Sequence, residues 1–60
     1  MTNKIGEVLI NKGIKQTWLA DKLGKSYNMV NSYVKNRRQP SLPVLKKIAE
    51  ILEVDIKELI

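Results

Sequence analysis

The chain has 60 residues, enough for one small domain with a single core. It contains neither Cys nor His, which excludes disulfides, thiolate and imidazole metal sites and the commonest general base, so neither a cofactor nor an enzymatic activity is expected. The net charge is +5, and residues 22–49 hold seven Lys and Arg but no acid. Such a segment is typical of a surface that binds a polyanion, although a solvated basic surface would give the same pattern.

No apolar run approaches the length of a membrane span, and the N-terminus has no signal-peptide core, so a cytoplasmic protein is expected. Turn signals divide residues 1–60 into five short helical stretches without strand-like alternation, which predicts one all-α domain. The first three helices are expected over about residues 3–11, 16–22 and 27–35. The expected N-caps are Thr2 or Asn3 for the first helix, Ser26 for the third, Ser41 for the fourth, and Asp55 with Glu58 for the last.

Apolar residues recur at helical spacing in every stretch, and these stripes predict the core. The third helix also has a distinctive opposite face, which is polar, lacks carboxylates and consists of Tyr27, Asn28, Asn31, Ser32 and Lys35. The inward residues are expected to be Ile5, Val8, Leu9, Leu19, Ala20, Leu23, Val30, Tyr33, Val34, Leu42, Leu45, Ile48, Ala49, Leu52, Ile56 and Leu59.

Residues 16–35 have the spacing of a helix-turn-helix. Ala20 is small where two helices must cross closely, and Gly24 lies four residues later, where the turn needs a positive φ. Val30 and Tyr33 would then hold the next helix against the first. A small residue, a glycine and apolar residues at this spacing predict the motif.

Four sequence blocks in order, at residues 13–16, 19–26, 37–41 and 47–52, resemble the Cro and phage-repressor class of helix-turn-helix domains, the XRE family. The resemblance covers nearly the whole chain. It implies a compact, five-helix, lambda-repressor-like domain that binds double-stranded DNA with its third helix in the major groove. A sequence-specific transcriptional regulator, of the repressor type, is therefore expected.

The resemblance also implies roles for individual residues. Asn side chains can pair with adenine, and a Met tip can contact a thymine methyl. Arg side chains suit phosphate oxygens, and Gln16 stands at a helix N-terminus, where anions are favoured. The base-reading positions fall on Tyr27, Asn28 and Ser32, flanked by Met29 and Asn31; those that contact the DNA backbone are Gln16, Lys25, Lys35, Asn36, Arg37 and Arg38. Asn28, Asn31 and Ser32 could instead be ordinary surface residues.

Several positions depart from the family pattern. Leu9 and Val34 replace an ion pair that many members carry, and we expect the two side chains to touch. Asn36 and Glu53 stand where glycine is common, and Lys25 replaces an apolar residue of the turn. We expect Trp18 to pack over Leu9 and Val34, with a partner-binding role as the alternative.

A single recognition helix covers only a few base pairs, so a weak homodimer is expected to assemble on DNA. By the resemblance, the contact would lie between Glu53 and Ile60, where Val54, Ile56 and Leu59 add apolar atoms. Ile56, Leu59 and Ile60 could equally be the edge of the monomer core. The alternative function is an antitoxin-like interaction module, whose main partner is a protein and whose DNA binding is autoregulatory.

Overall fold

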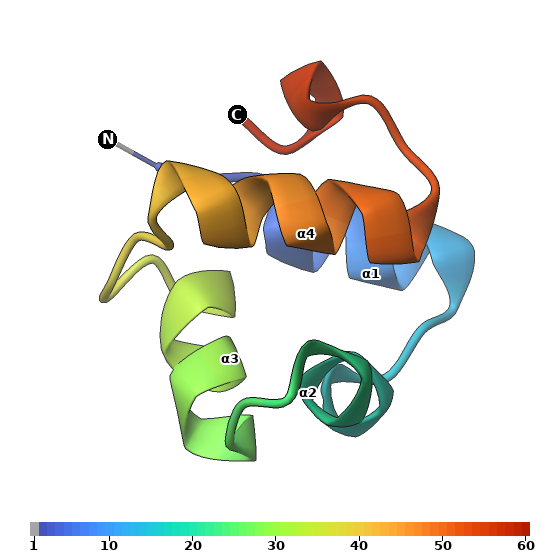
Figure 1. Ribbon diagram of the computed structural model, residues 1–60. Helices are drawn as coiled ribbons and strands as arrows, with labels where there is room; N and C mark the ends of the chain where they lie inside the picture. The colour runs from blue at the N-terminus through green and yellow to red at the C-terminus, as the bar shows by residue number, and fades with distance from the viewer. Residues whose placement is uncertain (1) are drawn as a thin grey trace.

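The computed structural model describes residues 2–60. Four α-helices, α1 (Ile5–Lys12), α2 (Gln16–Leu23), α3 (Tyr27–Val34) and α4 (Leu42–Leu52), precede a 3-10 turn, η1 (Ile56–Glu58) (Figure 1). The prediction of a fifth helix is therefore wrong, because the last element is a 3-10 turn and not an α-helix. Its hydrogen bonds are of the i→i+3 type, from Glu58 N to Asp55 O and from Leu59 N to Ile56 O. A segment of only three residues is too short to continue as an α-helix.

The predicted N-caps of α3, α4 and η1 are confirmed, whereas that of α1 is not. Ser26 Oγ accepts from Met29 N at 3.1 Å, and Ser41 Oγ accepts from Val44 N at 3.4 Å. Asp55 and Glu58 form the reciprocal capping box that opens η1. At α1 the N-cap position is Lys4, one residue later than expected, yet Asn3 Oδ1 still accepts from Ile5 N at 3.0 Å.

All four α-helices end in the same way. A residue with positive φ stands directly after α1, α2 and α4, and one position later after α3, where Lys35 (φ −82°) intervenes. Two reverse hydrogen bonds close each end, as in α1, where Gly13 N donates to Ile10 O and Ile14 N to Leu9 O. Glycine pays no steric penalty in this conformation, whereas a residue with a Cβ does. The four left-handed positions are Gly13 (φ 67°), Gly24 (φ 72°), Asn36 (φ 60°) and Glu53 (φ 56°).

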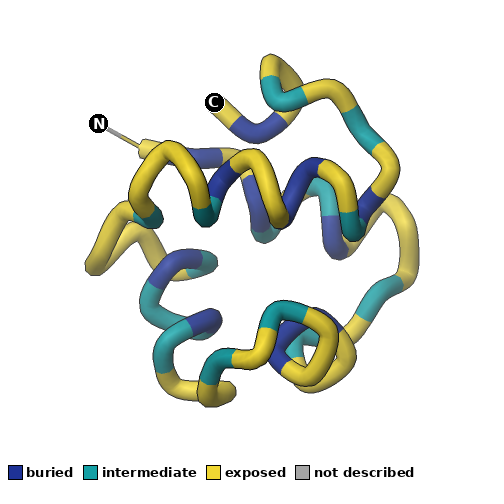
Figure 2. Tube along the Cα trace, viewed as in Figure 1, coloured by how far each residue is buried: buried dark blue, intermediate teal, exposed yellow. Residues whose placement is uncertain are grey.

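The core is one cluster to which all four α-helices contribute, together with Leu59 after η1 (Figure 2). Most predicted inward residues are buried, while Val8, Leu23, Val34 and Ile56 are partly buried against the cluster. Leu42 was wrongly assigned to the core: it is the first residue of α4 and is 59% exposed. The buried apolar residues are Ile5, Leu9, Leu19, Ala20, Val30, Tyr33, Leu45, Ile48, Ala49, Leu52 and Leu59.

Helix α2 packs against both α3 and α4, and α1 packs against α3. At the latter contact, a Cβ added to Gly6 would lie 3.0 Å from Val34 Cγ1, so the glycine permits a close approach. The first and last segments are tied together by a bond from Lys4 N to Leu59 O of 2.8 Å. Within residues 2–60, no helix is long and apolar enough to cross a bilayer.

Candidate nucleic-acid interface

The α2–turn–α3 unit has the geometry that its sequence predicts. Ala20 is buried at the crossing of the two helices, and Gly24 takes the left-handed conformation, with Lys25 N bonded to Ala20 O at 3.1 Å. Val30 is fully buried and Tyr33 is 5% exposed, so both hold α3 against the core. The unit thus presents α3 on the surface, at the end of the molecule away from η1 (Figure 1).

The outward face of α3 offers hydrogen-bonding groups. Tyr27 and Asn28 are exposed, and Asn31 is half-buried. Within residues 2–60, neither Asn amide makes an intramolecular hydrogen bond, so their donors and acceptors are free for a ligand. Ser32 Oγ donates to Asn28 O at 3.0 Å, which leaves its hydroxyl oxygen able to accept. This face can therefore both donate to and accept from base edges.

The loop after α3 folds back along the helix. Arg37 N and Arg38 N both donate to Ser32 O, at 2.9 and 3.3 Å. Arg38 Nη1 lies 3.5 Å from Met29 Sδ, so this guanidinium is beside the N-terminal half of α3. Arg37 is exposed. The Arg38 guanidinium thus lies beside the polar face, and Arg37 and Lys35 add two exposed positive charges next to it in the chain.

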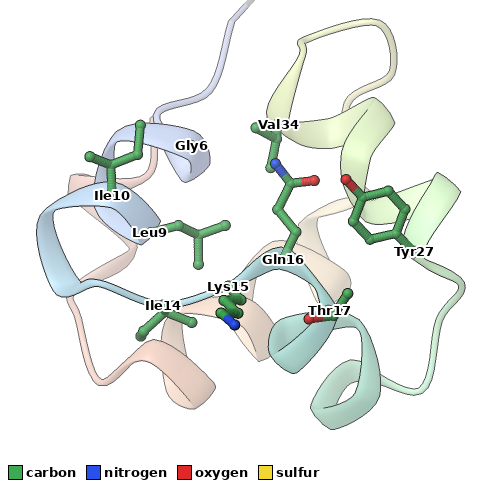
Figure 3. A pocket seen from close by; sticks show the side chains of 9 residues that line it. All are labelled: Gly6, Leu9, Ile10, Ile14, Lys15, Gln16, Thr17, Tyr27 and Val34. Atoms are coloured by element: carbon green, nitrogen blue, oxygen red, sulfur yellow. The ribbon is translucent and has the colours of Figure 1, made fainter.

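Two expected backbone-contacting residues have side chains already engaged or turned inward. The Asn36 amide bonds to the N-terminal segment and to Gln39. Gln16 Oε1 is buried and has no hydrogen-bond partner within residues 2–60. Figure 3 shows the Gln16 side chain pointing toward Val34 and Tyr27. A phosphate contact by the Gln16 amide therefore requires the side chain to leave this position.

Gln16 lies in a largely apolar cavity of about 400 Å³ between α1 and the helix-turn-helix (Figure 3). The N-terminus of α2, which borders the cavity, has no side-chain cap, unlike those of α3 and α4. Its first N–H groups are consequently available to an anion. The cavity is lined by Gly6, Leu9, Ile10, Ile14, Lys15, Gln16, Thr17, Tyr27 and Val34.

Comparison with known proteins agrees with this geometry. A family model described as helix-turn-helix, of the XRE type, matches residues 5–59, from the start of α1 to the end of the core. The chain belongs to this XRE-type helix-turn-helix family. This family is not an enzyme family, as the residue composition led us to expect.

A crystal structure from Bacteroides fragilis, of a protein with a provisional assignment as DNA-binding, is similar to the XRE-type chain throughout. The two are 43% identical, with a TM-score of 0.95, and the match covers 97% of this chain and 94% of the other. No curated protein matches the chain.

The departures from the XRE-type pattern can now be placed. Leu9 and Val34 line the same cavity, one from α1 and the other from the end of α3, so the two apolar replacements share one environment. Their direct contact stays a prediction. Trp18 lines a second cavity with Gly13, Ile14 and Lys15, and its packing over Leu9 and Val34 stays a prediction. It is 43% exposed, and Lys22 Nζ lies 5.6 Å from the centre of its ring, close enough for a cation–π contact.

Sequence reasoning missed the role of two residues next to this interface. Asn3 was considered only as a helix cap, but its side chain also bonds to Tyr33 O and Gln39 Oε1. Gln39 in turn donates to Asn36 Oδ1 at 3.1 Å. No local signal could have revealed the two bonds of the Asn3 side chain, because they join residues 30 and 36 positions apart.

Proposed function

We propose that this chain binds double-stranded DNA at a specific sequence, with α3 in the major groove, and acts as a transcriptional regulator of the repressor type. The observation that carries the proposal is the outward face of α3. Asn28 and Asn31 present free amides there, and the Arg38 guanidinium of the following loop lies beside Met29 on the same helix. An Asn amide can donate to and accept from the major-groove edge of adenine, a pairing that discriminates between bases.

The proposed contacts divide into two sets. Side chains on the N-terminal half and outward face of α3 would meet base edges, whereas the α2 N-terminus, the turn and the basic loop would meet phosphates. The base-reading set is Tyr27, Asn28, Met29, Asn31 and Ser32, and the backbone set is Gln16, Lys25, Lys35, Asn36, Arg37 and Arg38.

Selection of binding sequences from random duplexes tests the proposal, because it yields both the operator and its symmetry. Affinity for the selected operator and for random DNA is then measured over a range of salt concentrations. Arg37→Ala should weaken binding to both duplexes alike and reduce the slope of log K against log salt by about 0.9. Lys12→Ala is the matched control: it removes the same charge from the exposed end of α1, outside the proposed contacts, and should leave the slope unchanged.

Enrichment of no sequence above random DNA would contradict the specific function. A loss for Arg37→Ala that is confined to the operator would instead assign Arg37 to base reading. Either result is distinct from a failure to bind any DNA, which would contradict the proposal as a whole.

We further propose that the chain acts as a weak homodimer on a two-fold symmetric operator, with half-sites about 34 Å apart. Ile60 is 48% exposed and supports a contact through the end of the chain, with Val54 and Ile56 partly exposed beside it. Leu59 is fully buried in the monomer and is not available. The small apolar area fits a dimer that assembles on DNA rather than a permanent one.

The second candidate, an antitoxin-like interaction module, is favoured by exposed apolar side chains next to the two cavities. Ile10 is 80% exposed and Trp18 is 43% exposed, and both lie outside the proposed DNA-binding face. A protein partner that copurifies with the wild-type chain but not with an Ile10→Lys and Trp18→Lys double variant would favour this candidate.

A further inference from the structure

The side chain of Asn3 joins the start of the chain to the basic loop. It is the one buried polar residue of the described chain, with 8% of its surface exposed. Its Oδ1 accepts from Ile5 N at 3.0 Å, and its Nδ2 donates to Tyr33 O at 2.9 Å and to Gln39 Oε1 at 3.0 Å. Both amide hydrogens are therefore directed at the end of α3 and at the loop that follows it.

The loop returns these bonds through Asn36. Asn36 Oδ1 accepts from Asn3 N at 2.7 Å and from Gln39 Nε2 at 3.1 Å, and Asn36 Nδ2 donates to Asn3 O at 3.4 Å. We refer to Asn3, Asn36 and Gln39 as the amide clip. Arg37 and Arg38 lie between its two loop members, so the clip fixes the backbone on both sides of the two guanidinium groups.

The choice of residue at position 3 points to the loop rather than to the helix start. Ser or Asp would cap the beginning of α1 equally well, because that bond needs only an oxygen acceptor. Only an amide also supplies the two hydrogens that reach Tyr33 O and Gln39 Oε1. At Asn36, similarly, glycine would take the positive φ of 60° more easily but would have no side chain for the clip.

We infer that Asn3 is a positioning residue for nucleic-acid binding: through Asn36 and Gln39 it holds the basic loop in its binding conformation before the ligand arrives. The inference rests on the proposed DNA-binding function. A loop that is ordered in the free protein loses less conformational freedom when its Arg side chains bind phosphate, so affinity rises without any added contact. Because Asn3 is buried, it acts without touching the DNA itself.

Asn3→Ser and Asn36→Gly provide the test. Asn3→Ser keeps a neutral acceptor for Ile5 N but lacks both amide hydrogens, and Asn36→Gly keeps the backbone conformation but removes the other half of the clip. Each should bind all duplexes about tenfold more weakly, the equivalent of one net hydrogen bond, with a salt slope equal to that of the wild type. The Asn3→Ser, Asn36→Gly double variant should lose no more than the larger single loss, since both changes open the same clip.

Unchanged affinity of folded Asn3→Ser, additive losses in the double variant, or a slope reduced as in Arg37→Ala would each overturn the inference. Amide hydrogen exchange of Arg37 and Arg38 in the free protein gives a second readout that needs no DNA. Exchange should speed up in both single variants, and wild-type protection in them would also overturn the inference. If the wild type binds no DNA, the proposed function fails, while the exchange experiment still decides whether the clip orders the loop.

Discussion

Glu53 occupies a position that favours glycine, and replacing it should stabilise the domain. It follows α4 with φ 56° and ψ 46°, and the helix end is closed by bonds from Glu53 N to Glu50 O and from Val54 N to Ala49 O. A residue with a Cβ in this conformation costs about 1–2 kcal/mol. Glycine avoids that cost but loses about 0.5–1 kcal/mol more conformational freedom on folding. We therefore expect Glu53→Gly to add about 1 kcal/mol from backbone conformation.

The charge of Glu53 must be separated from its conformation. The last turn of α4 contains no basic residue, so an acid at this helix end is itself unfavourable by a few tenths of a kcal/mol. Glu53→Ala removes the charge but keeps a Cβ, and the difference between the Gly and Ala variants isolates the backbone contribution. In a domain of this size, about 1 kcal/mol corresponds to a Tm difference of about 4–8 °C, which thermal unfolding followed by circular dichroism can measure.

Gly13 provides the reverse experiment at the end of α1. It has φ 67°, and an added Cβ would meet no atom within 4 Å, so Gly13→Ala tests conformation without a steric clash. The free energy of unfolding of this variant should fall below that of the wild type. The loss should be about equal to the difference in free energy of unfolding between the Glu53→Gly and Glu53→Ala proteins. Equal Tm values for the Glu53→Gly and Glu53→Ala proteins would refute the reasoning, because they would show that the left-handed position carries no strain.

Three further predictions concern specificity, the core and assembly. Asn28→Ala should cost roughly 1–3 kcal/mol at the selected operator and almost nothing on random DNA; equal weakening of both would make Asn28 a backbone contact. Leu9→Arg and Val34→Glu should each lower the free energy of unfolding in urea, and the double variant should recover part of the loss, whereas additive losses would show that the two sites are not coupled. Ile60→Asp should stay folded, but sedimentation should no longer find two chains bound to one operator. Leu59→Asp should unfold the chain, because Leu59 is fully buried. Binding of one wild-type monomer with full affinity to an asymmetric site would contradict the dimer.

Helix positions, caps and family membership followed from the sequence because they depend on near neighbours. Ser26, Ser41 and the Asp55–Glu58 pair act within three residues of their own positions, and Gly13 and Gly24 end helices through backbone conformation alone. The stripes of apolar residues similarly predicted most of the core, since one face of each short helix must turn inward.

Only the tertiary structure decided the features that join distant segments. Leu42 continues the stripe of α4 but is exposed in the packed domain, and Leu59 belongs to the core rather than to a free surface. The Gln16 side chain lines a cavity together with residues of α1 and α3, a position that depends on how these helices pack. Asn3 reaches Gln39 across 36 positions, and no local propensity encodes such a contact, because it exists only when the packed helices bring the two ends of the bond together.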